Sequence, residues 1–168
     1  LNGYGRLTVG NFAAKTFEGA VGGPVSDTVG ARVAVKWDQR DGYGKNLFTG
    51  SQIDDRDAVA VRAMVSFAPS DDVKATLIAD YFKEDDNNSA FHYFGTTATP
   101  ENGLGHNLLG GKTIFDYYAT RGQAADLRNI YSDQEPINQR DGTGLTALVD
   151  FKLGEWDVKS VTAWRDFQ

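Results

Sequence analysis

The strongest constraint on the fold is a stretch in which apolar and polar residues alternate, residues 17–37. Every second residue of its latter half is apolar, namely Val29, Ala31, Val33, Val35 and Trp37. This period of two is typical of a β-strand whose two faces meet different surroundings. The preceding GGPVSDT carries Pro24, Ser26 and Asp27, residue types that favour a tight turn. The stretch therefore predicts a β-hairpin with one apolar face, which could contact a soluble core or lipid.

Five further segments show the same kind of pattern over the rest of the chain. The seven predicted strands cover about residues 3–11, 16–23, 28–40, 56–68, 73–84, 142–153 and 156–167. They predict an all-β fold, an antiparallel up-and-down meander of about seven strands. The last segment is the poorest match, because Ser160 and Thr162 lie on its apolar face. A chain of 168 residues is long enough for one domain with a hydrophobic core.

The connections between these strands are short at one end of the meander and long at the other. The short ones are the turns GPVSD, PSDD and GE, and the long ones are residues 41–55 and 85–141. Outer-membrane β-barrels combine short periplasmic turns with long extracellular loops, so residues 85–141 are predicted to be a long extracellular loop. Within it, residues 123–131 could form a short helix. The connection at residues 12–16 departs from the pattern, because it is short where a long loop is expected.

Aromatic residues recur at a fixed distance from the short turns. Trp37, Tyr81 and Trp164 each follow a turn residue by ten positions. Ten residues of tilted strand rise roughly 25 Å, which is the height of the apolar band of a membrane barrel. We therefore expect these three at the outer membrane interface. The aromatics expected at the inner interface, beside the short turns, are Phe67, Phe151 and Trp156. The alternative is that aromatic residues simply favour strands.

Composition excludes several other classes of protein. The chain has no cysteine, so it can form neither a disulfide nor a cysteine metal site, and its two histidines make a histidine-rich metal site improbable. The net charge of −6 argues against a nucleic-acid partner. No apolar run is long enough for a transmembrane helix. The mean hydropathy of −0.42 looks soluble, but alternating strands hide their apolar face from any average over a window.

Several segments resemble the TonB-dependent outer-membrane receptors. FEGAVGGPVSDTVGARVAVKWDQRDGY, residues 17–43, resembles their early barrel strands. There a small-residue–Gly–Pro step precedes a turn with Asp, an Arg-bearing strand and a polar loop start. The matching positions are Gly23, Pro24, Asp27, Arg32, Arg40, Asp41, Gly42 and Tyr43. GYGRLTVGNF resembles the first strand after the family's plug, and WDVKSVTAWRDF resembles a recurrent barrel strand. The resemblance covers nearly all of the chain except residues 85–141.

The resemblance implies that residues 1–168 are part of a large, 22-stranded type of transmembrane β-barrel in the bacterial outer membrane. The implied function is active uptake of a scarce ligand, such as a ferric siderophore. The implied partners are outer-membrane lipid, the receptor's own plug domain and the TonB–ExbB–ExbD energy-coupling complex. These 168 residues hold neither the plug nor the coupling box, so we do not expect transport from them alone. The ligand itself is not specified by these motifs.

Two alternatives to this interpretation remain open. One is a soluble β-sandwich or carbohydrate-binding module that uses the long loop as its binding site. The other is a passive outer-membrane porin. A sandwich would bury the apolar strand faces under a second layer, whereas a barrel wall would leave them bare.

No residue pattern predicts an enzyme, a cofactor or a metal site. Ser89, His92 and Asp116 could be drawn as a Ser–His–Asp site, but nothing in the sequence positions them. The acidic runs 54–57 and 83–86 could bind a cation, although solvated charge clusters are the simpler interpretation. The candidate ligand-binding residues, all in the long loop, are Phe91, His92, Tyr93, Phe94, Phe115, Tyr117 and Tyr118. These side chains could enclose a hydrophobic or catecholate ligand, or equally pack the loop onto the barrel rim.

Overall fold

The computed structural model describes residues 1–92, 120 and 126–168. The chain forms two compact units. The first, the sheet unit, holds residues 1–40, 57–85 and 139–168. The second, the loop unit, holds residues 41–56 and 86–138.

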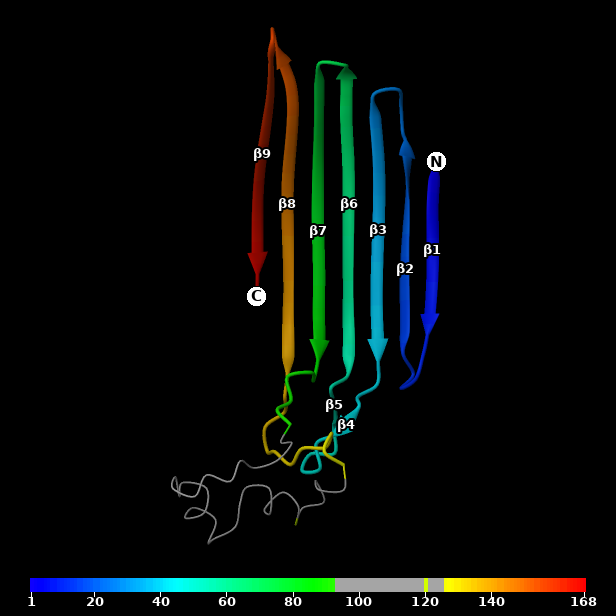
Figure 1. The fold of residues 1–168 in the computed structure, drawn as a ribbon, viewed down its shortest axis with the longest axis vertical. Helices are drawn as coiled ribbons and strands as arrows, with labels where there is room; N and C mark the ends of the chain where they lie inside the picture. Colours follow the sequence, from blue (N-terminus) through cyan, green and yellow to red (C-terminus); the bar gives the residue numbers. More distant parts are fainter. Residues whose placement is uncertain (93–119, 121–125) are drawn as a thin grey trace, which may run out of the picture. The chain divides into compact units, whose positions relative to one another are not determined.

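The sheet unit is built from seven long strands in one layer (Figure 1). They are β1 (Asn2–Val9), β2 (Lys15–Pro24), β3 (Val29–Arg40), β6 (Arg56–Ser70), β7 (Val73–Asp86), β8 (Asn138–Leu153) and β9 (Trp156–Phe167). Their order across the sheet is the order along the chain, and successive strands alternate in direction. The predicted all-β, antiparallel meander of seven strands is confirmed, and most predicted strand bounds agree with the structure to within two residues.

The largest difference lies where β7 ends and β8 begins. β7 continues to Asp86 and β8 starts at Asn138, so residues 85–86 and 138–141, predicted as loop, are strand. Polar side chains join these two strand ends across the sheet. Gln139 Nε2 donates to Asp85 Oδ1 at 2.9 Å, and Arg140 Nε donates to Glu84 Oε2 at 2.7 Å. A stretch rich in charge resembles a loop in sequence, but here Asp85 and Arg140 each have a polar partner on the neighbouring strand.

The three predicted tight turns connect strands at the same end of the sheet (Figure 1). In the β2–β3 turn, Ser26 Oγ accepts a hydrogen bond from the backbone amide of Val29 at 3.2 Å, as its residue type predicted. In the β8–β9 turn, Gly154 has φ +62°, the left-handed conformation that two-residue hairpins require and that glycine adopts without a steric penalty.

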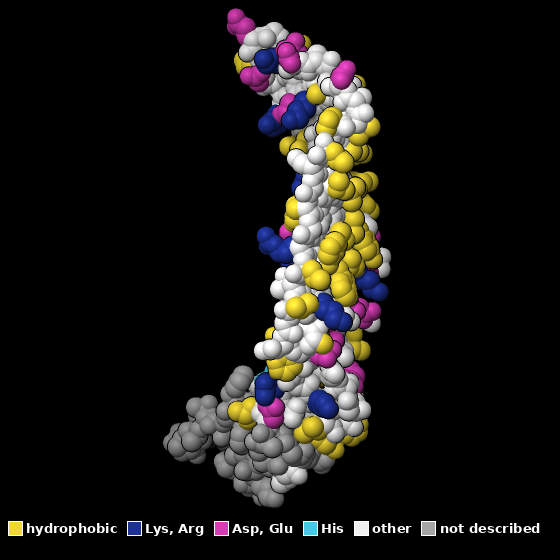
Figure 2. Space-filling model, turned by 90° about the vertical axis from the view of Figure 1, so that its right-hand side faces the viewer, with side chains coloured by type: hydrophobic (Ala, Val, Ile, Leu, Met, Phe, Trp, Pro, Cys, Tyr) yellow, Lys and Arg dark blue, Asp and Glu magenta, His cyan; other side chains and the backbone are white. Residues whose placement is uncertain are grey.

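The sheet has one apolar and one polar face, as the alternation predicted. Residues paired across antiparallel strands point to the same side. Val21 pairs with Val33, and Val65 pairs with Leu77. The alternate positions along each strand point to the opposite side of the sheet, and many of them are charged. They include the pairs Glu18–Lys36, Arg62–Asp80 and Asp150–Lys159. Figure 2 shows apolar side chains along one side of the sheet, while several Lys and Arg side chains project from the other.

The sheet unit has almost no hydrophobic core. Of the apolar residues that the structure describes, only Ala20, Ile53 and Ile130 are buried, and Ala20 alone belongs to the sheet unit. A chain of this length could hold a hydrophobic core, but the sheet unit buries only Ala20 of its apolar residues. A single sheet has no second layer of side chains against which its apolar face could pack.

The loop unit contains a small hairpin that the sequence did not predict. β4 (Gly44–Lys45) and β5 (Gln52–Ile53) pair antiparallel, and Asn46 forms a parallel bridge to Ile130. The Asn46 side chain is fully buried, donates to Ser132 O at 2.8 Å and accepts from the Ser132 amide at 3.2 Å. The helix predicted at 123–131 is not formed in its described part, 126–131, which contains a turn and this bridge.

Candidate functional site

The first candidate surface is the apolar face of the sheet unit. All six aromatics predicted for the membrane interfaces point to this face. The register pairs Trp37 with Phe17, Tyr81 with Val61, Trp164 with Leu145, Phe67 with Ala75, Phe151 with Val158 and Trp156 with Leu153. Trp37 and Tyr81 lie toward strand ends that lead to the long connections, Trp164 lies three residues before the end of β9, and the other three lie beside the short turns. Their shared face is confirmed, while their contact with lipid remains a prediction.

The apolar face is open to its surroundings. Val33, Val65, Leu77 and Leu145 lie in the middle of their strands, and each keeps about half of its surface exposed. Within the sheet unit, all of whose residues the structure describes, no layer of chain covers them. A run of exposed aliphatic side chains along several strands is the kind of patch that marks an interaction with lipid or another protein.

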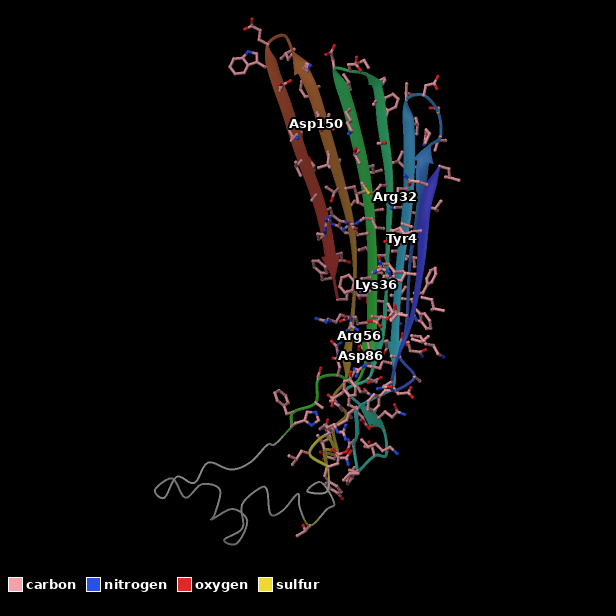
Figure 3. The ribbon with its side chains drawn as sticks, turned by 45° about the vertical axis from the view of Figure 1, so that its right-hand side comes forward. Tyr4, Arg32, Lys36, Arg56, Asp86 and Asp150 are labelled. Atoms are coloured by element: carbon pink, nitrogen blue, oxygen red, sulfur yellow. The ribbon has the colours of Figure 1, made fainter. Side chains whose placement is uncertain are left out.

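The second candidate surface is the polar face, where charged side chains are paired across strands. Tyr4 Oη donates to Glu18 Oε1 at 2.6 Å. Asp80 accepts from Arg62 and lies 3.8 Å from Arg165 Nη2, so two cations flank one carboxylate. Near the short turns, Lys159 Nζ lies 3.1 Å from Asp150 Oδ1. Figure 3 shows Tyr4, Lys36 and Asp150 spread along the sheet.

A hollow of about 460 Å³ lies against this polar face. Its lining includes the Tyr4–Glu18 pair, Lys36 and the cluster of Arg62, Asp80 and Arg165. Phe82 and Phe167 also line it, with ring centroids 6.1 Å apart. Gly142 makes room for the two rings, because a Cβ there would lie 2.5 Å from Phe82 Cε1. The hollow combines polar pairs with aromatic surface, but its shape gives no catalytic arrangement.

The third candidate surface is in the loop unit, around His92. Its Nε2 lies 2.8 Å from Asp54 Oδ2, and its Nδ1 lies 3.2 Å from the backbone oxygen of Leu127. Both ring nitrogens are therefore engaged, and neither faces Ser89. In this arrangement His92 cannot act as the general base of the Ser89, His92 and Asp116 site considered from the sequence, since a general base needs a free nitrogen toward its nucleophile. The contact joins residues far apart in sequence, so no local motif could have revealed it.

Of the seven candidate ligand-binding residues, the structure describes two. Phe91 is 87% exposed, and His92 makes the contacts given above. Tyr93, Phe94, Phe115, Tyr117 and Tyr118 lie outside the described residues, as does Asp116. The ligand-binding hypothesis for these aromatics therefore stays a prediction.

Two further polar contacts lie within the loop unit. Ser51 Oγ donates to Glu135 Oε2 at 2.6 Å, and this hydrogen bond, with smaller help from Thr49, lowers the pKa of Glu135 below its usual range. The Asp86 carboxylate, whose side chain is fully buried, lies 3.6 Å from Arg56 Nη1 and accepts from Asn138 Nδ2 at 2.8 Å (Figure 3). In residues 1–92 and 126–168, no group of three or more His, Asp or Glu side chains is placed to hold a metal ion.

In the part of the chain that the structure describes, no helix has the length and apolar character needed to cross a membrane. Comparisons with protein-family models, with curated proteins and with solved structures find no match to this chain.

Proposed function

We propose that this chain is a stretch of the wall of an outer-membrane β-barrel of the TonB-dependent receptor type, which takes up a scarce ligand such as a ferric siderophore. The observation that carries the proposal is the single sheet with a bare aliphatic face and a charged opposite face. Aromatic side chains stand at both ends of the bare face. In a membrane barrel, lipid covers the first face and the lumen hydrates the second.

The energetics of the apolar face favour lipid over water. Removing apolar surface from water contributes about 25 cal/mol per Å² to stability. In a soluble protein, a row of half-exposed Val and Leu side chains would stay in water and would not contribute this free energy. Lipid supplies that burial without a second protein layer. The polar face carries paired charges, which suits a hydrated lumen or a plug better than a hydrophobic core.

The proposal also requires further strands in the same protein. β1 and β9 are the two edges of the sheet. An edge strand exposes unpaired backbone amides and carbonyls, and lipid cannot satisfy them. Both edges would therefore pair with other strands of one closed barrel. The ligand-specific step and coupling to the TonB–ExbB–ExbD complex follow from the family resemblance alone.

The orientation of the two faces can be tested by site-directed spin labelling. The chain contains no cysteine, so a single cysteine at Val33 or at Ala34 adds one label site to it. These adjacent residues form a matched pair, because Val33 pairs with Val21 on the apolar face and Ala34 pairs with Ala20 on the polar face. The full-length protein is reconstituted into vesicles, and collisions of each label with oxygen and with a water-soluble nickel chelate are measured.

We expect the label at Val33 to collide mainly with oxygen, which concentrates in lipid, and the label at Ala34 to show much less oxygen contact. Equal oxygen contact at the two positions would refute a lipid-facing sheet and favour the soluble sandwich. A porin would give the same labelling as a receptor. Uptake of a radiolabelled ferric siderophore by cells separates these two, since only active uptake stops when an uncoupler collapses the proton gradient.

A further inference from the structure

The hollow on the polar face of the sheet unit has the size and the lining of a small-molecule site. All of its lining residues belong to the sheet unit, every residue of which the structure describes. Its volume of about 460 Å³ lies within the range of ligand pockets, roughly 300–1,000 Å³. Such pockets combine apolar surface with a few polar groups that fix the orientation of the ligand.

The charges around the hollow leave one cation without a partner. Three bases and two acids line it, namely Lys36, Arg62, Arg165, Glu18 and Asp80. Both arginines contact Asp80. Lys36 faces Glu18 in the register, yet within the part of the chain that the structure describes its Nζ forms neither an ion pair nor a hydrogen bond. The lining therefore carries one net positive charge, which favours an anion with a single negative charge.

A second group with free hydrogen-bond donors lies on the neighbouring strand. Arg62 donates to Asp80 through its Nε, and 60% of its side chain is exposed. Its two Nη nitrogens donate no hydrogen bond to any residue described. Lys36 lies on β3 and Arg62 on β6, which are neighbours in the sheet. A carboxylate between the two side chains could accept charge-assisted hydrogen bonds from both.

The opposite side of the hollow is apolar and aromatic. Ala60, on β6, pairs with Phe82 on β7, and the Phe82 ring lies 6.1 Å from the Phe167 ring. Phe167 keeps 66% of its surface exposed on a face that is otherwise rich in charge. The small side chain of Ala60 leaves space between β3 and the two rings. A flat apolar group can lie over Ala60 and contact the rings, because aromatic groups associate in offset or edge-to-face geometry.

We propose that this hollow binds an aromatic monocarboxylate. Its carboxylate lies between Lys36 and Arg62, and its ring lies over Ala60 against Phe82 and Phe167. The inference goes beyond the proposed function and does not depend on it, because it uses only the polar face and holds whatever covers the apolar face.

Isothermal titration calorimetry of the purified full-length protein in detergent micelles tests the site, with 2-naphthoate as the probe. The neutral analogue 2-naphthamide has the same rings without the charge. Lys36→Gln removes the free cation, and Ala60→Leu fills the space beside the rings without changing the charge. The matched control is Lys74→Gln, which removes the same charge from β7 at a position outside the hollow. Circular dichroism checks that each variant keeps its strands.

We expect saturable binding of 2-naphthoate to the wild-type protein and to Lys74→Gln with equal affinity. Lys36→Gln should weaken binding about tenfold, the effect of losing one charge-assisted hydrogen bond, and 2-naphthamide should bind the wild-type protein more weakly by a similar factor. Ala60→Leu should abolish saturable binding. The proposal is wrong if the wild-type protein shows no saturable binding, if the acid and the amide bind equally, or if Lys36→Gln or Ala60→Leu keeps wild-type affinity. Should Lys36→Gln fail to fold, the amide and Ala60→Leu decide the same question.

Discussion

Replacing Val33 with arginine should destabilise the folded barrel far more than the same replacement at Ala34. Val33 points to the apolar face, opposite Val21, and is 48% exposed in the sheet unit. It lies four residues before Trp37, about 13 Å along the strand, and a similar distance from the β2–β3 turn. This position is close to the middle of the predicted apolar band, where an arginine facing lipid costs about 2–4 kcal/mol.

Ala34 provides the matched control, because it lies one residue further on the same strand. It pairs with Ala20 and lines the hollow of about 460 Å³ beside Lys36. An arginine there has space and polar neighbours, so we expect a loss of less than about 1 kcal/mol. Both variants place an arginine on the same strand one residue apart, and the change in strand propensity, at most about 1 kcal/mol, is smaller than the difference expected from the two faces.

The assay is a urea titration of the full-length protein folded into lipid vesicles, followed by tryptophan fluorescence. A difference of 2–4 kcal/mol shifts the unfolding equilibrium constant by roughly 30- to 900-fold, well above experimental scatter. Equal losses for the two variants, or a larger loss at Ala34, would refute the assignment of the apolar face to lipid.

Two further predictions concern packing on the polar face and pH in the loop unit. Gly142→Ala should lower the free energy of unfolding by about 1–3 kcal/mol in the same titration, because the new Cβ would overlap Phe82 and Phe167. Gly5→Ala is the control and should cost much less, because no atom lies within 4 Å of its new Cβ. Equal losses of stability for the two variants would contradict the packing argument. The lowered pKa of Glu135 means that its contact with Ser51 stabilises the loop unit above the usual glutamate range and is lost as pH falls through the lowered value. Amide exchange in residues 46–53 should therefore accelerate on acidification, and Ser51→Ala should remove most of that response; an unchanged response in the variant would show that the contact contributes nothing.

The long strands could be predicted from sequence because each is at least eight residues long and alternates over most of its length. Period-two patterning needs several residues to be visible, and it placed the six predicted interface aromatics on the same face of the sheet. β4 and β5 have two residues each, too few for any period. They form because segments distant in sequence, such as Asn46 and Ile130, meet there.

The candidate site could be predicted only in part, for a physical reason. The charged ends of β7 and β8 looked like loop because solvated loops and polar cross-strand ladders share a composition. Their pairing, as in Glu84 with Arg140, depends on which strands become neighbours. The same holds for Asp54 and His92, whose contact requires a particular fold of the loop unit. The spacing of hydrophobic residues along the sequence does not predict such contacts between polar side chains.

The tight turns at one end of the sheet also suggest how this chain acquires its fold. Bringing two strands together across a turn of two to four residues loses little chain entropy, and β-hairpins of this kind close within microseconds. Joining β7 to β8 across residues 87–137 requires a much longer closure, about 3 kcal/mol more by the logarithmic law. The hairpins β2–β3, β6–β7 and β8–β9 are therefore the expected early folding units. The contacts of the loop unit, which connect these hairpins, would form last and open first.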